Sequence, residues 1–189
     1  MIKIGILGGI GSGKSYVAKC FGYPVFNADY EVSKLYKKDK RTYNKLKKIL
    51  PKHFQSFPIE KAEVSNAILA NKSNLSKIVK IIHLEIRKKL NNFLKKNKNK
   101  KFVILDIPLL LENKLNKKED ILIFVQSKKI EISKRLKKRK NFNQKLFNKF
   151  KNIQLPLDYK RKKSQFIIKN NFTKKHVMMS VRNILNKIM

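Results

Sequence analysis

Eight residues near the start of the chain have the spacing of a phosphate-binding loop. Residues 8–15 fit the pattern G-x-x-x-x-G-K-[ST] at every position. The apolar residues 2–7 predict a strand before this loop, and residues 12–21 predict a helix after it. In such a loop, backbone N–H groups and the helix N-terminus bind phosphate oxygens. Lys14 would reach the β- and γ-phosphates and the Ser15 hydroxyl would ligate Mg²⁺. The motif therefore predicts a nucleoside triphosphate, but it does not determine the reaction.

Two aspartates follow predicted strands, at the edge where an open α/β sheet binds its ligands. Asp29 comes after the predicted strand at residues 23–27, and Asp106 comes after the one at residues 102–105. Asp29 is either the base that accepts the proton of an attacking hydroxyl or the N-cap of the next helix. Asp106 is either a Walker-B-like group near Mg²⁺ or a turn residue before Ile107-Pro108. The residues alone leave both questions open.

Two further pairs of side chains are spaced four residues apart, which places each pair on one face of a helix. His83 and Arg87 either grip a phosphate or polar substrate together or lie at the surface. Arg135 and Arg139 are two of only six arginines in a chain with 47 lysines and arginines. Because the planar fork of arginine binds phosphate bidentately, they are either phosphate ligands or part of a solvated helix face.

The chain is strongly basic, with a formal net charge of +35. A basic surface attracts nucleic acid, but lysine greatly exceeds arginine, asparagine and isoleucine are abundant, and the lysines are spread over the whole chain. This pattern favours the compositional bias of an AT-rich genome over a specific nucleic-acid site. No apolar run reaches the roughly 18 residues that span a bilayer, so we expect no membrane partner. The single cysteine, Cys20, favours a cytoplasmic location.

Predicted strands alternate with predicted helices along the chain, which is typical of an α/β fold with a mostly parallel sheet. The length of 189 residues supports one domain. Besides the strands already named, two more are predicted at residues 120–126 and 166–169. Helical periodicity covers residues 31–50, 61–96 (two or three helices), 129–138, 144–152 and 174–187.

With these motifs in place, the chain resembles the dephospho-CoA kinase family over nearly its whole length. Residues 6–15 look like the first strand and phosphate loop of that family, and Asn27-Ala28-Asp29 is similar to its D-A-D motif, whose second Asp is taken as the catalytic base. His83-Leu84-Glu85-Ile86-Arg87 resembles its H-P-x-[VI]-R motif at the acceptor site. The most distinctive match is residues 106–112, Asp-Ile-Pro-Leu-Leu-Leu-Glu, to D-[IV]-P-L-L-[FL]-E.

The resemblance continues into the second half of the chain, with some departures. Arg135 and Arg139 fall where the family keeps lid arginines, and Gln154 and residues 166–170 fall near its adenine site. The departures are Asn27 for the first Asp of D-A-D, Leu84 for the usual Pro, Ser164-Gln165 for Ala-Asp, Phe172 where Gly is common, and a reduced turn at residues 53–58.

The resemblance implies a P-loop kinase core with a parallel sheet of about five strands, a helical acceptor-binding region and a short lid, all in one domain. The expected core comprises residues 1–33, 100–134 and 151–189, the acceptor region about 34–95, and the lid about 135–150. The implied reaction is ATP-dependent phosphorylation of the ribose 3′-hydroxyl of dephospho-CoA, giving CoA and ADP. ATP and Mg²⁺ are the implied cofactors, and the enzyme is expected to be a monomer or weak homo-oligomer.

The resemblance implies roles for individual residues at the positions of this chain that match the family's motifs. The resemblance implies catalytic roles for Asp29, Lys14 and Arg139, and a metal-binding role for Ser15. The implied ATP-binding residues are Gly8, Gly9, Ile10, Gly11, Ser12, Gly13, Lys14, Ser15, Tyr16, Arg135, Arg139 and Asn170. The implied acceptor-binding residues are Asp29, His83, Arg87, Asp106, Pro108 and Leu109.

Two other functions compete with this interpretation. A nucleoside monophosphate kinase shares the core and the lid and differs only at the acceptor site, where residues 106–112 together with His83 and Arg87 favour dephospho-CoA. A basic P-loop NTPase that binds nucleic acid would explain the charge. It is disfavoured because the sequence has no aromatic-studded basic stripe and no helix-turn-helix or RRM signature.

Overall fold

The structure is a computed structural model that describes residues 1–139 and 142–189. It consists of two compact units. The first unit comprises residues 1–27, 97–143 and 147–189, and the second comprises residues 28–96 and 144–146.

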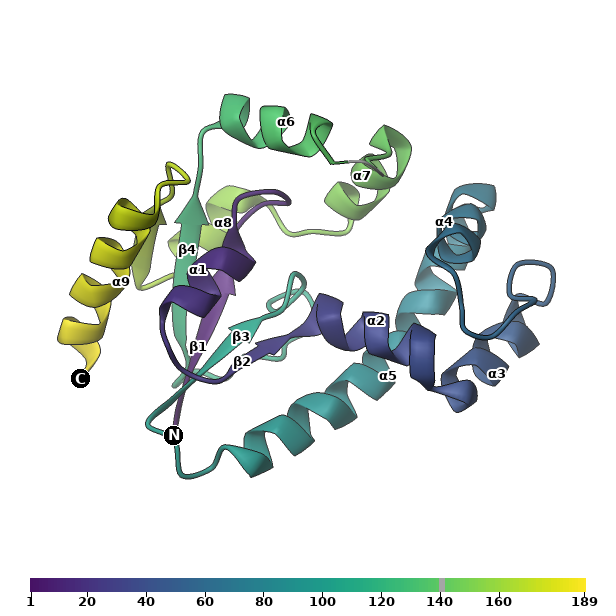
Figure 1. The fold of residues 1–189 in the computed structure, drawn as a ribbon, viewed down its shortest axis with the longest axis horizontal. Coiled ribbons are helices and arrows are strands. Elements are labelled where there is room, and N and C mark those ends of the chain that lie inside the picture. Colours follow the sequence, from purple (N-terminus) through teal and green to yellow (C-terminus); the bar gives the residue numbers. More distant parts are fainter. Residues whose placement is uncertain (140–141) are drawn as a thin grey trace. The chain divides into compact units, whose positions relative to one another are not determined.

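A five-stranded parallel sheet forms the centre of the first unit (Figure 1). The strand order is β2-β3-β1-β4-β5, so the first strand of the chain lies in the middle. All four pairings are parallel, which confirms the predicted α/β class and the number of strands. The strands are β1 (Ile2–Leu7), β2 (Val25–Asn27), β3 (Phe102–Asp106), β4 (Ile121–Gln126) and β5 (Phe166–Lys169).

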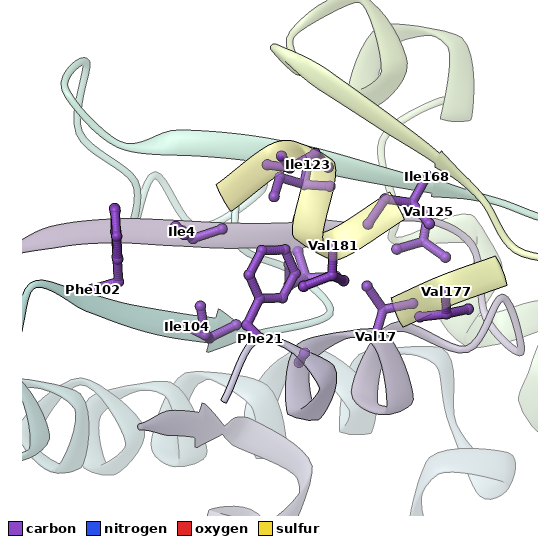
Figure 2. Packing of buried hydrophobic residues seen from close by; sticks show 13 residues of the cluster. Ile4, Val17, Phe21, Phe102, Ile104, Ile123, Val125, Ile168, Val177 and Val181 are labelled. Carbon is purple, nitrogen blue, oxygen red and sulfur yellow. The ribbon is translucent and has the colours of Figure 1, made fainter. Parts of the chain in front are cut away.

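One face of this sheet is covered by α1 (Lys14–Cys20) and α9 (Lys174–Ile188), which contact each other. Figure 2 shows Val17 and Phe21 together with Val177 and Val181 packing against side chains of the strands. Burying a side chain of this size stabilises the fold by about 1.5–3 kcal/mol. The strand residues of the cluster are Ile4, Ile6, Phe102, Ile104, Ile123, Val125 and Ile168. The core therefore fixes the strand β1, which leads into the phosphate loop, and the helix α1, which follows it.

Three shorter helices also belong to the first unit, except that the first three residues of α7 belong to the second unit. They are α6 (Lys129–Lys137), α7 (Gln144–Asn152) and α8 (Leu157–Lys162). Helices were predicted at the positions of α6 and α7, whereas α8 was not predicted. It begins directly after Pro156, whose side chain cannot cap it, and no apolar stripe marks its six residues.

The second unit is helical and contains α2 (Ala28–Lys38), α3 (Lys40–Ile49), α4 (Lys61–Ala70) and α5 (Lys72–Lys96). The prediction of a single helix over residues 31–50 is wrong, because two helices cover this segment and Asp39 separates them. The Asp39 carboxylate accepts hydrogen bonds from the backbone N–H groups of Arg41 and Thr42 and so caps α3. Ion pairs link α5 to its neighbours, Glu85 to Lys45 at 2.8 Å and Lys89 to Glu31 at 3.5 Å. Within the described residues, no helix has the length and apolarity that a membrane span requires.

Candidate active site

The phosphate loop turns sharply between β1 and α1. Gly13 is the N-cap of α1 and has φ +90° and ψ +18°, a left-handed conformation that side chains rarely adopt. A Cβ placed there would clash with Nδ2 of Asn170, so the position also lacks space for one. Nζ of Lys14 donates a hydrogen bond to the Gly9 carbonyl oxygen at 2.8 Å. The ammonium is thus held against the loop that the motif predicts to bind phosphates.

Ser15, Asn27 and Asp106 meet at the carboxyl edge of the sheet. Parallel pairing puts Asn27 of β2 opposite Asp106 of β3, and the Asn27 amide donates to Oδ2 of Asp106 at 2.5 Å. The same amide nitrogen lies 3.5 Å from Oγ of Ser15. Asp106 is the last residue of β3 and is only 3% exposed. The Asn27 side chain, which differs from the first Asp of the D-A-D motif, therefore joins Asp106 to the phosphate loop.

The donor set at this edge suits Mg²⁺. A hydroxyl and a carboxylate are oxygen ligands, and Mg²⁺ is usually held by one or two protein groups plus substrate phosphates and water. No group of three or more His, Cys, Asp or Glu residues that could hold a metal occurs in the part of the chain that the structure describes. The Ser15 hydroxyl and the Asp106 carboxylate therefore fit a divalent metal that is held together with substrate phosphates.

The loop after β3, which carries Pro108 and Leu109, is tied down by a buried ion pair. Nζ of Lys160, a residue 1% exposed, lies 2.7 Å from Oε1 of Glu112 and 3.4 Å from the Pro108 carbonyl oxygen. Oε1 of Glu112 also accepts from the Leu155 N–H at 2.9 Å. Leu110 from the same loop is fully buried. Glu112, the last residue of the motif at residues 106–112, thus fixes its loop to α8 and to the segment before that helix.

We expect Lys160→Met to lower the free energy of unfolding by about 3 kcal/mol, because it leaves the Glu112 carboxylate buried without its cation. Urea denaturation measures this difference. Lys162→Met in the same helix is the control, since Lys162 is exposed. The double variant Lys160→Met/Glu112→Gln should recover part of the loss. A double variant that is less stable than Lys160→Met would contradict this account of the pair.

Asn170 connects the end of β5 to the phosphate loop. It is 3% exposed, and its Nδ2 donates to the Ser12 carbonyl oxygen at 2.9 Å. Arg135 lies in the last turn of α6, and Arg139 follows the end of that helix; both are exposed. Tyr16 is 43% exposed on α1. Of the lid predicted at residues 135–150, residues 140–141 lie outside the described residues.

The second unit carries the remaining predicted site residues. Asp29 is exposed and is the second residue of α2, so the N-cap interpretation is wrong: the carboxylate lies in the first turn and not before it. His83 and Arg87 are one turn apart on α5, as their spacing predicts. Partial burial of the His83 ring, and then the positive charge of Arg87, lower the pKa of His83 below its ordinary value of 6.5.

Sequence reasoning missed two residues that shape the site. Lys160 has no signal in a chain this rich in lysine, and only the structure shows it buried. The link that Asn27 forms between Asp106 and Ser15 depends on strand pairing, which the local pattern does not reveal. The one indication of this link in the sequence was that the two strands were predicted to belong to a mostly parallel sheet.

A phosphate loop that follows the central strand of a parallel sheet ordered β2-β3-β1-β4-β5 defines a P-loop kinase. The sequence profile of the family described as dephospho-CoA kinase matches residues 2–176. A dephospho-CoA kinase from Wolbachia sp. subsp. Brugia malayi (strain TRS) is 33% identical over 190 residues, covering 98% of this chain and 97% of the relative. The chain therefore belongs to the dephospho-CoA kinase family.

Solved structures agree on the fold. A crystal structure of a protein from Thermus thermophilus is similar with a TM-score of 0.79 at 24% identity, covering 100% of this chain and 98% of the other. Dephospho-CoA kinase from Campylobacter jejuni is similar with a TM-score of 0.65 at 20% identity, covering 98% of this chain and 96% of the other.

Proposed function

We propose that this chain transfers the γ-phosphoryl group of ATP to the ribose 3′-hydroxyl of dephospho-CoA, giving CoA and ADP. The observation that carries the proposal is the phosphate loop joined through Asn27 to Asp106, the first residue of the family's most distinctive motif. Membership of the dephospho-CoA kinase family supports the choice of acceptor.

Catalysis of phosphoryl transfer consists mainly of alignment and of neutralising charge on the transferred group. Backbone N–H groups of the loop and the ammonium of Lys14 bind the β- and γ-phosphates. Arg135 and Arg139 add positive charge from the lid. Ser15 would ligate Mg²⁺, which would offset the negative charge of the phosphates when bound. Asn170 lies on the adenine side, and the other nucleotide contacts come from Gly8, Gly9, Ile10, Gly11, Ser12, Gly13 and Tyr16.

Six residues are proposed to bind the acceptor. His83 and Arg87 hold its anionic part, and Asp29 accepts the proton of the attacking hydroxyl. Asp106, Pro108 and Leu109 form the remaining contacts. The buried Lys160–Glu112 pair keeps Pro108 and Leu109 in place by fixing their loop.

A coupled assay of ADP formation tests the proposal with dephospho-CoA, AMP, CMP and shikimate in parallel, each with ATP and Mg²⁺. We expect turnover with dephospho-CoA to exceed that with the other acceptors by at least about 10²-fold, because differential acceptor binding separates these kinases. Product analysis must show phosphate on the 3′-hydroxyl. Equal turnover with AMP or CMP would refute the proposed acceptor.

Affinity for dephospho-CoA should rise as the pH falls through and below 6.5, the ordinary pKa of histidine. The pKa of His83 is lowered in the free protein, and an anion bound beside the ring raises it again, so binding takes up a proton. The diphosphate bridge of dephospho-CoA stays ionised over this range and adds no slope of its own. Because the ring is half-exposed, we expect an increase of about 3-fold.

Calorimetric titration without nucleotide measures this affinity between pH 7.5 and pH 5.5. His83→Gln should bind more weakly and independently of pH. His53→Gln is the matched control, since His53 is also a partly buried histidine of the second unit. A His83→Gln variant that keeps the slope of the wild-type chain would show that His83 does not contact the acceptor.

A further inference from the structure

Phe172 lies just beyond β5 in a backbone conformation that favours glycine. Its φ is +64°, and among the described residues the only other non-glycine with positive φ is Lys114, at +51°. A side chain in the left-handed region is strained, whereas glycine adopts it without steric cost. Phe172 nevertheless places a large aromatic ring at this position.

The backbone of Phe172 is attached to the phosphate loop through Asn170. The Phe172 N–H donates to Oδ1 of Asn170 at 2.8 Å, and Nδ2 of Asn170 donates to the Ser12 carbonyl oxygen at 2.9 Å. The ring itself reaches the loop, because Cε1 of Phe172 lies 3.3 Å from the position that a Cβ on Gly13 would occupy. Phe172 is therefore held beside the start of α1 by both its backbone and its ring.

The other side of the interaction comes from α6. The guanidinium carbon of Arg135 lies 4.3 Å from the centroid of the Phe172 ring, a cation–π distance. Ile132 and Leu136 on the same helix lie 3.1 and 3.2 Å from the position that a Cβ on Gly11 would occupy. The helix that carries Arg135 and the ring of Phe172 thus contact the same loop separately, the helix at Gly11 and the ring at Gly13.

We propose that Phe172 is a positioning residue for nucleotide binding, whose ring holds the Arg135 guanidinium beside the phosphate loop. Arginine stacks the flat face of its guanidinium on aromatic rings, an arrangement that leaves the N–H edges able to donate to phosphate oxygens. A long exposed arginine loses rotamer freedom when it binds a ligand, and a contact formed in advance reduces that loss. The inference rests on the proposed function for the identity of the nucleotide and for the contact of Arg135 with phosphate.

Calorimetric titration with AMP-PNP and Mg²⁺, with no acceptor present, tests the inference. Phe172→Gly should raise the Kd about 5-fold, the size expected for loss of a cation–π contact. Phe172→Leu should do the same, and Phe172→Trp, which keeps an aromatic face, should stay within about 2-fold of the wild-type chain. Melting temperature should not fall for Phe172→Gly, because glycine relieves the backbone strain. Lys114→Gly is the matched control: it relieves the same kind of strain in an exposed residue and should leave the Kd unchanged.

A double-mutant cycle distinguishes positioning from direct contact with the nucleotide. If Phe172 acts through Arg135, Phe172→Gly should have no further effect on the Kd in an Arg135→Met background. The same 5-fold rise in both backgrounds would overturn the inference and indicate direct contact of the ring with the nucleotide. An unchanged or lower Kd for Phe172→Gly in the wild-type background would also overturn it. The stack itself is visible as a ring-current shift of the Arg135 side-chain NMR signals, which Phe172→Leu should remove.

Failure of this inference differs from failure of the proposed function. AMP-PNP binding does not involve the acceptor, so the cycle gives its result even if dephospho-CoA proves to be the wrong substrate. A wild-type chain that bound no AMP-PNP would refute both.

Discussion

Replacing Lys14 with alanine should lower the kcat of phosphoryl transfer by about 10²-fold or more while the chain stays folded. Its Nζ lies 2.8 Å from the Gly9 carbonyl oxygen, inside the loop that we propose to bind the phosphates. The positive charge stabilises the transferred phosphoryl group most strongly in the transition state. The variant also loses the bond to Gly9, which is worth about 1 kcal/mol, so only a small fall in melting temperature is expected.

Steady-state ADP formation and thermal unfolding together measure this effect. Lys19→Ala is the matched control, because Lys19 is an exposed lysine in the last turn of the same helix. It removes the same charge from a chain of high positive charge without touching the loop. Near wild-type kcat in the Lys14→Ala variant would mean that residues 8–15 are not the phosphate site.

Much of the fold could be predicted because the signals that define it are local. The strand β1, the turn at Gly13 and the helix α1 are contiguous, and their residue types specify them directly. The same holds for β3, whose first four residues are an uninterrupted apolar run that the structure buries on both faces. Predicting a mostly parallel sheet required only that strands alternate with helices along the chain, whereas the strand order was not predicted.

The break at Asp39 and the buried Lys160 could not be predicted, for a different reason. Residues 31–50 have helical periodicity throughout, and only the cap bonds of Asp39 to Arg41 and Thr42 show where the second helix begins. Lys160 is buried because Glu112, 48 residues earlier in the chain, meets it across the fold. Long-range pairings of this kind are set by tertiary packing, which a pattern in one segment does not contain.

In the candidate site too, local sequence patterns identify single residues, whereas tertiary contacts determine how these residues are connected. Residue types identified Ser15 and Asp106 individually, Ser15 as the last residue of the phosphate-loop motif and Asp106 as the residue after a predicted strand. Their connection through Asn27 follows from the register of β2 with β3, in which Asn27 stands opposite Asp106. The replacement of an expected Asp by Asn at position 27 thus exchanges a second carboxylate for a hydrogen-bond donor to the first.

The Asp29→Asn variant should lose about 10²–10⁴-fold in kcat, with ATP affinity and melting temperature nearly unchanged. The chain leaves β2 at the carboxyl edge of the sheet, and Asp29 is the second residue of the helix that follows. We propose that its carboxylate accepts the proton of the ribose 3′-hydroxyl as the bond to phosphorus forms. Asparagine has the same shape but cannot accept that proton. Because Asp29 is in the first turn of α2, its negative charge also interacts favourably with the helix dipole, which stabilises the fold by only about 0.3–1 kcal/mol.

The matched control is Asp158→Asn, which makes the same change at an exposed aspartate in the first turn of α8. Both variants remove one negative charge from a helix start, so a difference in kcat between them isolates the chemistry from the helix electrostatics. Single-turnover measurements with saturating ATP and dephospho-CoA remove product release from the comparison. A purely structural role for Asp29 predicts equal, small effects of the two variants on stability and none on kcat. Ordinary turnover by the Asp29→Asn enzyme would decide against Asp29 as the base.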